Sequence, residues 1–171
     1  KASFTALVDY DIYFKSLNAA ALLGTLQLPA RWNLSFDAEK RNSPIISLRS
    51  ALIGQNVTTI SDLQGIFTPS EILQMAEDRT AVSSNYTLTA THPVGQRFQF
   101  ALTAGVSDLG ATPASFGVPA VAATGTSVNL QAQLYGSNLW KQGDFSVLSA
   151  AYADTETGKI ASLGVTSRLP V

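Results

Sequence analysis

The chain has 171 residues, a formal net charge of −1 and no cysteine. This length suffices for one domain with its own core or for a small closed barrel, and the lack of cysteine excludes a disulfide framework, a thiolate metal site and a cysteine nucleophile. Only 13% of the residues are charged, about half the share of a typical soluble domain. The balanced charge gives no reason to expect nucleic acid or another polyionic partner, and the composition suits a sheet whose outer face meets something less polar than water.

No targeting segment and no transmembrane helix is predicted. Lys1 leads directly into a strand pattern without an initiator Met or an apolar leader, so we expect a mature form or an excised piece. The longest uncharged run, 109–140, is long enough to span a bilayer as a helix. We reject that reading because the run contains Pro113, Pro119, several glycines and many polar residues.

Three strands are predicted in the first part of the chain. Between Ser3 and Phe14 apolar and polar residues alternate with the period of a strand that has one apolar face. The same alternation predicts strands over 20–28 and 32–39. It leaves open whether the third strand continues past Pro44 to Arg49.

Residues 50–84 interrupt this rhythm and are predicted to form a helical insertion. Ser61–Gln64 and Thr68–Glu71 both fit the capping-box pattern, and Pro69 occupies the favoured first helical position. The apolar spacing behind them predicts two short helices, 61–66 and 69–79. Three roles remain open for the insertion: a cap over a barrel mouth, a constriction folded into a lumen, or a helix that binds a partner.

The second half of the chain returns to strand periodicity. Residues 85–107 form two alternating arms around a Pro/Gly turn, which predicts a β-hairpin with one apolar and one polar face. After a Gly/Pro/Ala-rich loop, further strands are predicted at 128–135, 145–153 and 159–169. We therefore expect an all-β fold, an antiparallel up-and-down meander of about eight strands in a single domain over 1–171.

The connections between these strands alternate in length. Short turns are expected at 29–31, 92–97 and 137–144, and long connections at 40–84 and 108–126. A sequence motif, called here the repeated short-turn phrase, recurs on the short side. Leu-Pro-Ala-Arg-Trp at the first short turn resembles His-Pro-Val-Gly-Gln-Arg-Phe at the second. The last four residues, Arg-Leu-Pro-Val, look like the opening of a third copy, which favours a piece of a larger barrel.

This pattern resembles the outer-membrane β-barrel proteins of Gram-negative bacteria, both porins and exporters. It combines short turns on one side, long loops on the other, strands with one apolar and one polar face, and aromatic residues beside the turns. The likeness covers nearly the whole chain but is one of architecture. The first strand, tilted by about 40°, would rise roughly 25 Å, the height of the apolar band in such barrels. The resemblance implies localisation in the outer membrane, contact with its lipid, and association with the rest of a larger barrel or with a periplasmic domain. The Leu-Pro-Val end departs from the aromatic end common in this class.

In such a barrel the two faces of the strands would have different roles. The polar face would line a hydrated lumen, with these residues: Asp9, Asp11, Asp37, Glu39, Arg97, Gln99, Asn129, Gln131, Gln133 and Arg168. Aromatic residues would lie at the membrane interfaces, namely Phe4, Phe14, Trp32, Phe98 and Trp140.

No pattern in the sequence predicts catalysis. Gly-x-Ser-x-Gly, His-Glu-x-x-His and phosphate-loop motifs are absent, and the only histidine, His92, precedes a proline in a turn. Without a second histidine or a cysteine, a zinc site is not expected. We expect no enzyme activity, no cofactor and no metal.

Two pairs of carboxylates admit two interpretations. Asp9 with Asp11, and Asp37 with Glu39, project from one face of their strands and could serve acid–base chemistry or bind calcium. We favour a wet lumen wall, with these arginines as counter-charges: Arg49, Arg97 and Arg168.

The sequence therefore predicts a pore or an export channel of the outer membrane. The alternative is a soluble eight-stranded barrel with its apolar face inward, holding a small hydrophobic ligand, although its surface would carry unusually few Lys and Glu. A structural β-protein, such as an adhesin or capsid domain, is a third possibility.

Overall fold

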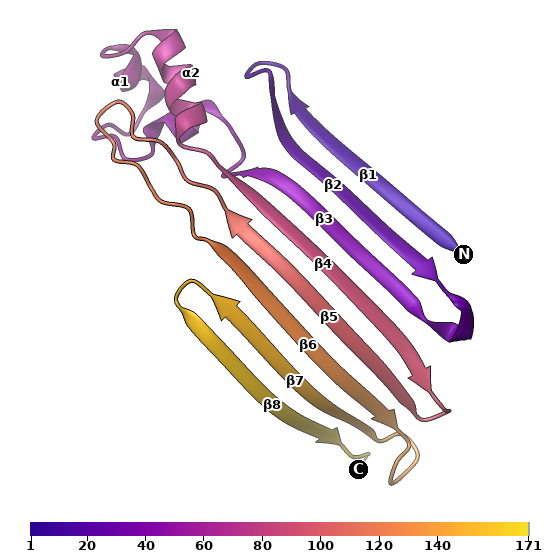
Figure 1. Ribbon diagram of the computed structural model, residues 1–171. Coiled ribbons are helices and arrows are strands. Elements are labelled where there is room, and N and C mark those ends of the chain that lie inside the picture. The colour runs from indigo at the N-terminus through magenta and orange to yellow at the C-terminus, as the bar shows by residue number, and fades with distance from the viewer. Residues whose placement is uncertain (171) are drawn as a thin grey trace.

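The computed structural model describes residues 1–170 and contains a single antiparallel sheet of eight strands (Figure 1). The strands are paired in sequence order, so each lies beside the next one along the chain. They are β1 (Ala2–Asp11), β2 (Ser16–Gln27), β3 (Asn33–Ser43), β4 (Ala81–Val94), β5 (Phe98–Leu109), β6 (Thr126–Ser137), β7 (Phe145–Thr155) and β8 (Gly158–Arg168). The predicted all-β meander is confirmed.

The pairing registers place residues of like polarity on the same face. Phe36 lies opposite Gly24 and Leu88, whereas the next residue, Asp37, lies opposite Leu23 and Thr87. Because successive side chains of a strand point to opposite faces, one face of the sheet is apolar along its length and the other is mainly polar. The alternation in the sequence is the direct cause of this two-faced sheet.

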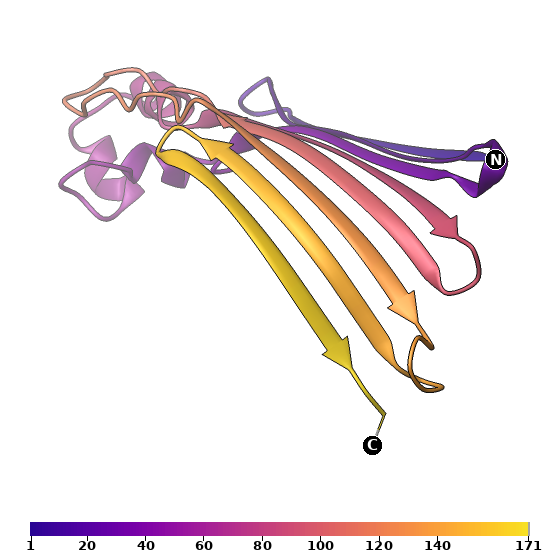
Figure 2. The ribbon, with the colours of Figure 1, turned by 60° about the horizontal axis from the view of Figure 1, so that its bottom comes forward.

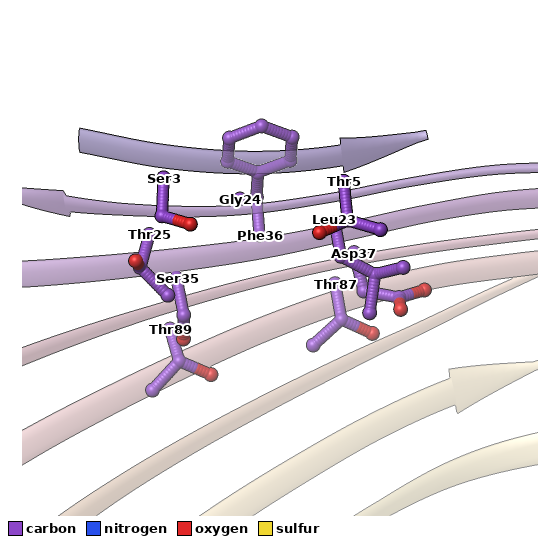
Figure 3. A pocket seen from close by; sticks show the side chains of 10 residues that line it. All are labelled: Ser3, Thr5, Leu23, Gly24, Thr25, Ser35, Phe36, Asp37, Thr87 and Thr89. Atoms are coloured by element: carbon purple, nitrogen blue, oxygen red, sulfur yellow. The ribbon is translucent and has the colours of Figure 1, made fainter. Parts of the chain in front are cut away.

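The sheet bends but remains open (Figure 2). β1 and β8 form its two edges, and no pairing joins them within residues 1–170. The polar side chains of the first strands point toward the side on which the later strands lie, and Phe36 points away (Figure 3). On β5, accordingly, Ala101 and Gly105 of the polar face are buried, whereas Leu102 and Val106 of the apolar face are exposed. The polar face is the concave one.

Short turns gather at one end of the sheet and the long connections at the other (Figure 1). The short turns join β2 to β3, β4 to β5 and β6 to β7. The helical insertion between β3 and β4 and the long loop between β5 and β6 lie at the opposite end, where tight turns also join β1 to β2 and β7 to β8. This is the arrangement that the sequence predicts.

The insertion has a small core of its own. A 3₁₀ helix (Leu48–Leu52) is followed by α1 (Ile60–Gln64) and α2 (Pro69–Asp78). The buried residues at their contact are Ala51, Leu63, Ile72, Met75 and Ala76. The main packing partners of the two helices are each other and the 3₁₀ helix, not the strands. None of the described helices combines the length and the apolar composition that crossing a membrane requires.

The start of α2 is as predicted and the start of α1 is not. The Thr68 hydroxyl accepts from the Glu71 N–H (3.4 Å), and the Glu71 carboxylate accepts from the Thr68 N–H (2.7 Å), which completes the capping box. The capping box predicted at Ser61–Gln64 is wrong. Thr59 caps α1 instead, accepting from the N–H of Asp62 at 3.2 Å, and so starts the helix one residue earlier.

The end of β1 differs from the prediction, and the question left open at the end of β3 is decided. β1 stops at Asp11 rather than Phe14, because the Asp11 carboxylate accepts the N–H groups of Tyr13 (2.8 Å) and Phe14 (2.9 Å) and turns the chain. β3 stops at Ser43 and does not reach Arg49, which lies in the 3₁₀ helix of the insertion.

Candidate functional site: the polar face of the sheet

The concave face is lined by hydroxyl and amide side chains from every strand. Those near its middle include Thr5, Thr25, Ser35, Thr87, Thr89, Thr103, Gln131, Ser149 and Ser162. Hydroxyl and amide groups offer both donors and acceptors. Such a wall suits water or a polar solute.

A shallow hollow of about 270 Å³ opens on this face over β1 to β4 (Figure 3). Thr5 of β1 lies on one side of it and Thr87 and Thr89 of β4 on the other. Asp37 of β3 is the single charged residue of its lining, and Leu23 the largest apolar one that points into it. The hollow therefore combines hydroxyl groups and one negative charge with apolar lining surface such as that of Leu23.

Side chains on the next strands hold one another in place. The hydroxyl oxygens of Thr89 and Thr103 are 3.1 Å apart across β4 and β5. The Asn129 carboxamide lies over Gly105, where an added Cβ would be 2.5 Å from its Oδ1. A glycine at this position thus lets the amide lie flat against the sheet, and the concave surface stays open there.

The four predicted lumen carboxylates have different surroundings. Asp37 and Glu39 lie on the polar face of β3, and Glu39 Oε1 is 3.7 Å from Nε of Arg41 on the same strand. This pair is largely solvated, so it contributes little to stability. Asp9 lies on β1 at a register shift, and Asp11 is used by the turn that ends β1. Asp9 and Asp11 therefore do not form an equivalent pair.

The predicted arginine counter-charges are not brought to these carboxylates. Arg49 lies in the insertion, whereas Arg97 in the β4–β5 turn and Arg168 at the end of β8 lie at the short-turn end. Across residues 1–170 the side-chain ion pairs are the contact between Glu39 and Arg41 and the one between Lys159 and Asp154, at 3.0 Å. The predicted amides, in contrast, all lie on the polar face: Gln99, Asn129, Gln131 and Gln133.

The convex face presents large apolar side chains that no part of residues 1–170 covers. Phe4, Val8, Leu163 and Val165 are each more than 60% exposed, and exposed Leu, Phe and Val side chains continue across the strands between them. Soluble monomers rarely expose contiguous apolar patches larger than a few hundred Å², and full burial of one such side chain is worth about 1.5–3 kcal/mol. An apolar face of this extent is typical of a surface that contacts another phase or a partner.

The predicted interface aromatics separate into two groups. Phe4, Trp32 and Phe98 lie on the apolar face or at its short-turn border, and Trp140 is exposed in the β6–β7 turn. Phe14 differs, because it packs against the core of the insertion.

Trp32 stacks on His92 of the neighbouring strand, with ring centroids 4.6 Å apart and an interplanar angle of 20°. Trp32 is the last residue of the first copy of the repeated short-turn phrase, and His92 is the first residue of the second copy.

The described residues hold no arrangement suited to metal binding. Within 1–170 no group of three or more His, Asp or Glu side chains lies close enough to hold an ion. Comparison of the chain with protein-family models, curated proteins and solved structures gives no match. Any function must therefore be argued from the two faces of the sheet and its two ends.

The main feature that residue-by-residue reading of the sequence missed is the hydroxyl wall of the hollow. Thr5, Thr25, Ser35, Thr87 and Thr89 were visible as polar positions of separate strands. Only the pairing of β1 to β4 brings them together.

Proposed function

We propose that this chain forms the wall of an outer-membrane β-barrel, or part of one, that acts as a pore or an export channel. The observation that carries the proposal is the pairing of an uncovered apolar convex face with a hydroxyl-rich concave face on strands of ten to fourteen residues. A transmembrane strand needs about 9–11 residues. Every strand of the sheet meets that length.

The direction of bending supports this proposal over the soluble alternative. A ligand-binding barrel for a hydrophobic molecule needs its apolar face inside. Here closure along the existing curvature would place Ala101, Thr103 and Gly105 inside and Leu102 and Val106 outside. The apolar side chains would then contact lipid, and the backbone groups of the strands would be paired within a closed ladder, as a bilayer requires.

The mechanism that we propose is passive. Threonine, glutamine and asparagine side chains of the concave face would replace part of the hydration of a passing solute. Asp37 would add one negative charge near the middle of β3, without a basic partner in the described residues. A channel built this way would favour cations over anions.

The insertion fits the role of a cap at one mouth. Its helices pack on one another and on the 3₁₀ helix rather than along the polar face of the strands. They lie at the long-loop end of the sheet (Figure 1). A helix folded into the lumen would instead pack on residues such as Thr89 or Thr103.

The test is reconstitution. The chain is refolded in detergent, transferred to lipid vesicles and examined for resistance to extraction and for a shift in gel mobility between unheated and heated samples. Conductance across planar bilayers then compares the parent with Asp37→Asn, with Asp78→Asn at the surface of α2 as the matched control.

We expect stable integration, a heat-dependent mobility shift, and cation preference that falls in Asp37→Asn but not in Asp78→Asn. A monodisperse monomer in detergent-free buffer would contradict the membrane proposal and favour a soluble barrel. Integration without conductance would restrict the chain to a structural part of a barrel.

A further inference from the structure

The three short turns share a pairing of a cation with an aromatic residue. Arg31 precedes Trp32 in the β2–β3 turn, Arg97 precedes Phe98 in the β4–β5 turn, and Trp140 precedes Lys141 in the β6–β7 turn. All three turns lie at the same end of the sheet (Figure 1). We refer to Arg31, Arg97 and Lys141 as the cationic rim.

Within residues 1–170 no acidic side chain forms an ion pair with this rim. Arg31, Arg97 and Lys141 are exposed, and none takes part in an ion pair within residues 1–170. The one acid in these turns, Asp144, is 2% exposed and accepts the N–H groups of its own turn. Arg168, at the end of β8, adds a further exposed cation at this end.

The opposite end of the sheet differs. There Lys159 pairs with Asp154 at 3.0 Å and Arg41 with Glu39 at 3.7 Å, and the insertion carries both signs of charge. An excess of positive charge is thus found at the short-turn end, although the chain as a whole has a formal charge of −1.

The rim also lies where the apolar face ends. Trp32 stacks on His92 at the border of that face, and the Phe98 ring lies against Gly136, 3.2 Å from where a Cβ would be. Trp and Tyr collect at the headgroup level of a bilayer, and Arg and Lys beside them extend their charged ends into that layer. Cations at this depth attract anionic lipid.

We propose that the cationic rim binds the phosphate groups of anionic lipid headgroups at the bilayer surface that the short turns meet. This inference rests on the proposed membrane function. Each arginine can donate two hydrogen bonds to one phosphate, and Lys141 acts as a point charge. The expected preference for anionic over zwitterionic lipid is on the order of fivefold per cation.

The experiment uses the whole chain in phosphatidylcholine vesicles that contain a trace of fluorescent lipid, either phosphatidylglycerol or phosphatidylcholine. Energy transfer from Trp32 and Trp140 reports which headgroup is enriched around the short turns. The test variant carries Arg31→Gln, Arg97→Gln and Lys141→Gln. The control removes three exposed, unpaired cations at the other end of the sheet: Lys15→Gln, Lys40→Gln and Arg49→Gln.

We expect the parent and the control to enrich phosphatidylglycerol, with an enrichment that declines as salt is added, and the rim variant to lose most of it. Equal transfer to both lipids from an integrated parent chain would overturn the rim assignment and leave the membrane proposal intact. Failure to integrate in any vesicle would overturn both.

A second experiment tests whether the rim binds a soluble polyanion. Polyglutamate is added to the chain in phosphatidylcholine vesicles, and its binding is followed by Trp140 fluorescence. Binding that is lost in the rim variant, together with no preference for phosphatidylglycerol, would replace the lipid assignment with an acidic polypeptide partner.

Discussion

Phe36 of β3 covers Gly24 of β2 on the apolar face. A Cβ added to residue 24 would overlap the Phe36 ring and would lie 2.9 Å from Cδ1 of Phe4. The rings of Phe4 and Phe36 have centroids 6.0 Å apart, so they pack over the glycine from both neighbouring strands. The glycine in the middle of β2 therefore serves aromatic packing across three strands.

Gly24→Ala is expected to lower the free energy of unfolding by about 1–3 kcal/mol, because the added methyl group overpacks the two rings. The entropic gain of replacing a glycine, about 0.4–1 kcal/mol, is smaller and of opposite sign. Urea titration of the detergent-refolded chain measures the difference.

Gly65→Ala is the control for this change. Its Cβ would meet only the Asp62 carbonyl oxygen at 3.4 Å, and its φ is −73°, so we expect a change within about 0.5 kcal/mol. Adding Phe36→Leu to Gly24→Ala should recover part of the lost stability. An unchanged unfolding midpoint in Gly24→Ala would contradict the packing described here.

Arg79 ties the insertion to the β5–β6 loop. It is 5% exposed, and its guanidinium donates to the carbonyl oxygens of Pro113 (3.3 Å) and Ser115. No carboxylate takes part in this contact within residues 1–170. The buried charge therefore depends on these carbonyl groups, and the loop is held by a side chain distant from it in sequence.

Arg79→Met should release the loop while leaving the strands folded. A hydrogen bond to a charged group is worth about 1.5–3 kcal/mol, and that local stability would be lost. Chymotrypsin cleavage after Phe116 is expected to accelerate, with no change in the urea midpoint of the sheet. Arg49 is an exposed cation of the same insertion, and chymotrypsin should cleave Arg49→Met at the parent rate. Equal cleavage rates in Arg79→Met and Arg49→Met would contradict the proposal that Arg79 holds the loop.

The parts of this fold that follow from short-range patterns were readable in the sequence. Alternation placed Thr87 and Leu88 on opposite faces, and the spacing from Thr68 to Glu71 marked the start of α2. The role of Arg79 and the packing of Phe14 on the insertion were not readable, because they join segments that only the folded chain brings together. The curvature of the sheet was equally hidden, since a period of two fixes which face a side chain takes and not how strongly the sheet bends.

Glu71 makes the stability of α2 depend on pH. The Thr68 backbone N–H, and next the Thr68 hydroxyl, lower the pKa of the Glu71 carboxylate below 4.5. A carboxyl group with a lowered folded-state pKa stabilises the fold above its unfolded pKa, and this contribution disappears as the pH falls through the folded value.

Glu71→Gln should therefore melt at a lower temperature than the parent at neutral pH, and the difference should vanish well below pH 4.5. Thermal loss of the helical circular-dichroism signal measures it. Glu77→Gln, exposed on the same helix, is the control and should melt close to the parent at neutral pH. A difference in melting temperature between Glu71→Gln and the parent that persists in acid would contradict the capping role of Glu71.

Asp144 organises the β6–β7 turn. Its carboxylate accepts from the N–H groups of Leu139 (2.7 Å), Lys141 (3.0 Å) and Trp140. Burial raises the pKa of Asp144, but the backbone N–H groups, that of Lys141 first, outweigh it, so the pKa lies below 3.8. The turn that presents Trp140 and Lys141 thus depends on an ionised carboxylate.

Asp144→Ala should loosen this turn, because an alanine leaves the three N–H groups without their acceptor. Trypsin cleavage after Lys141, followed in detergent micelles by mass spectrometry, is expected to accelerate. Cleavage after Arg97 in the β4–β5 turn is the internal control and should keep its rate. Asp144→Asn retains an acceptor oxygen and should fall between the parent and Asp144→Ala. If Lys141 and Arg97 accelerated equally in Asp144→Ala, the effect would be general unfolding, and Asp144 would not be the specific organiser of its turn.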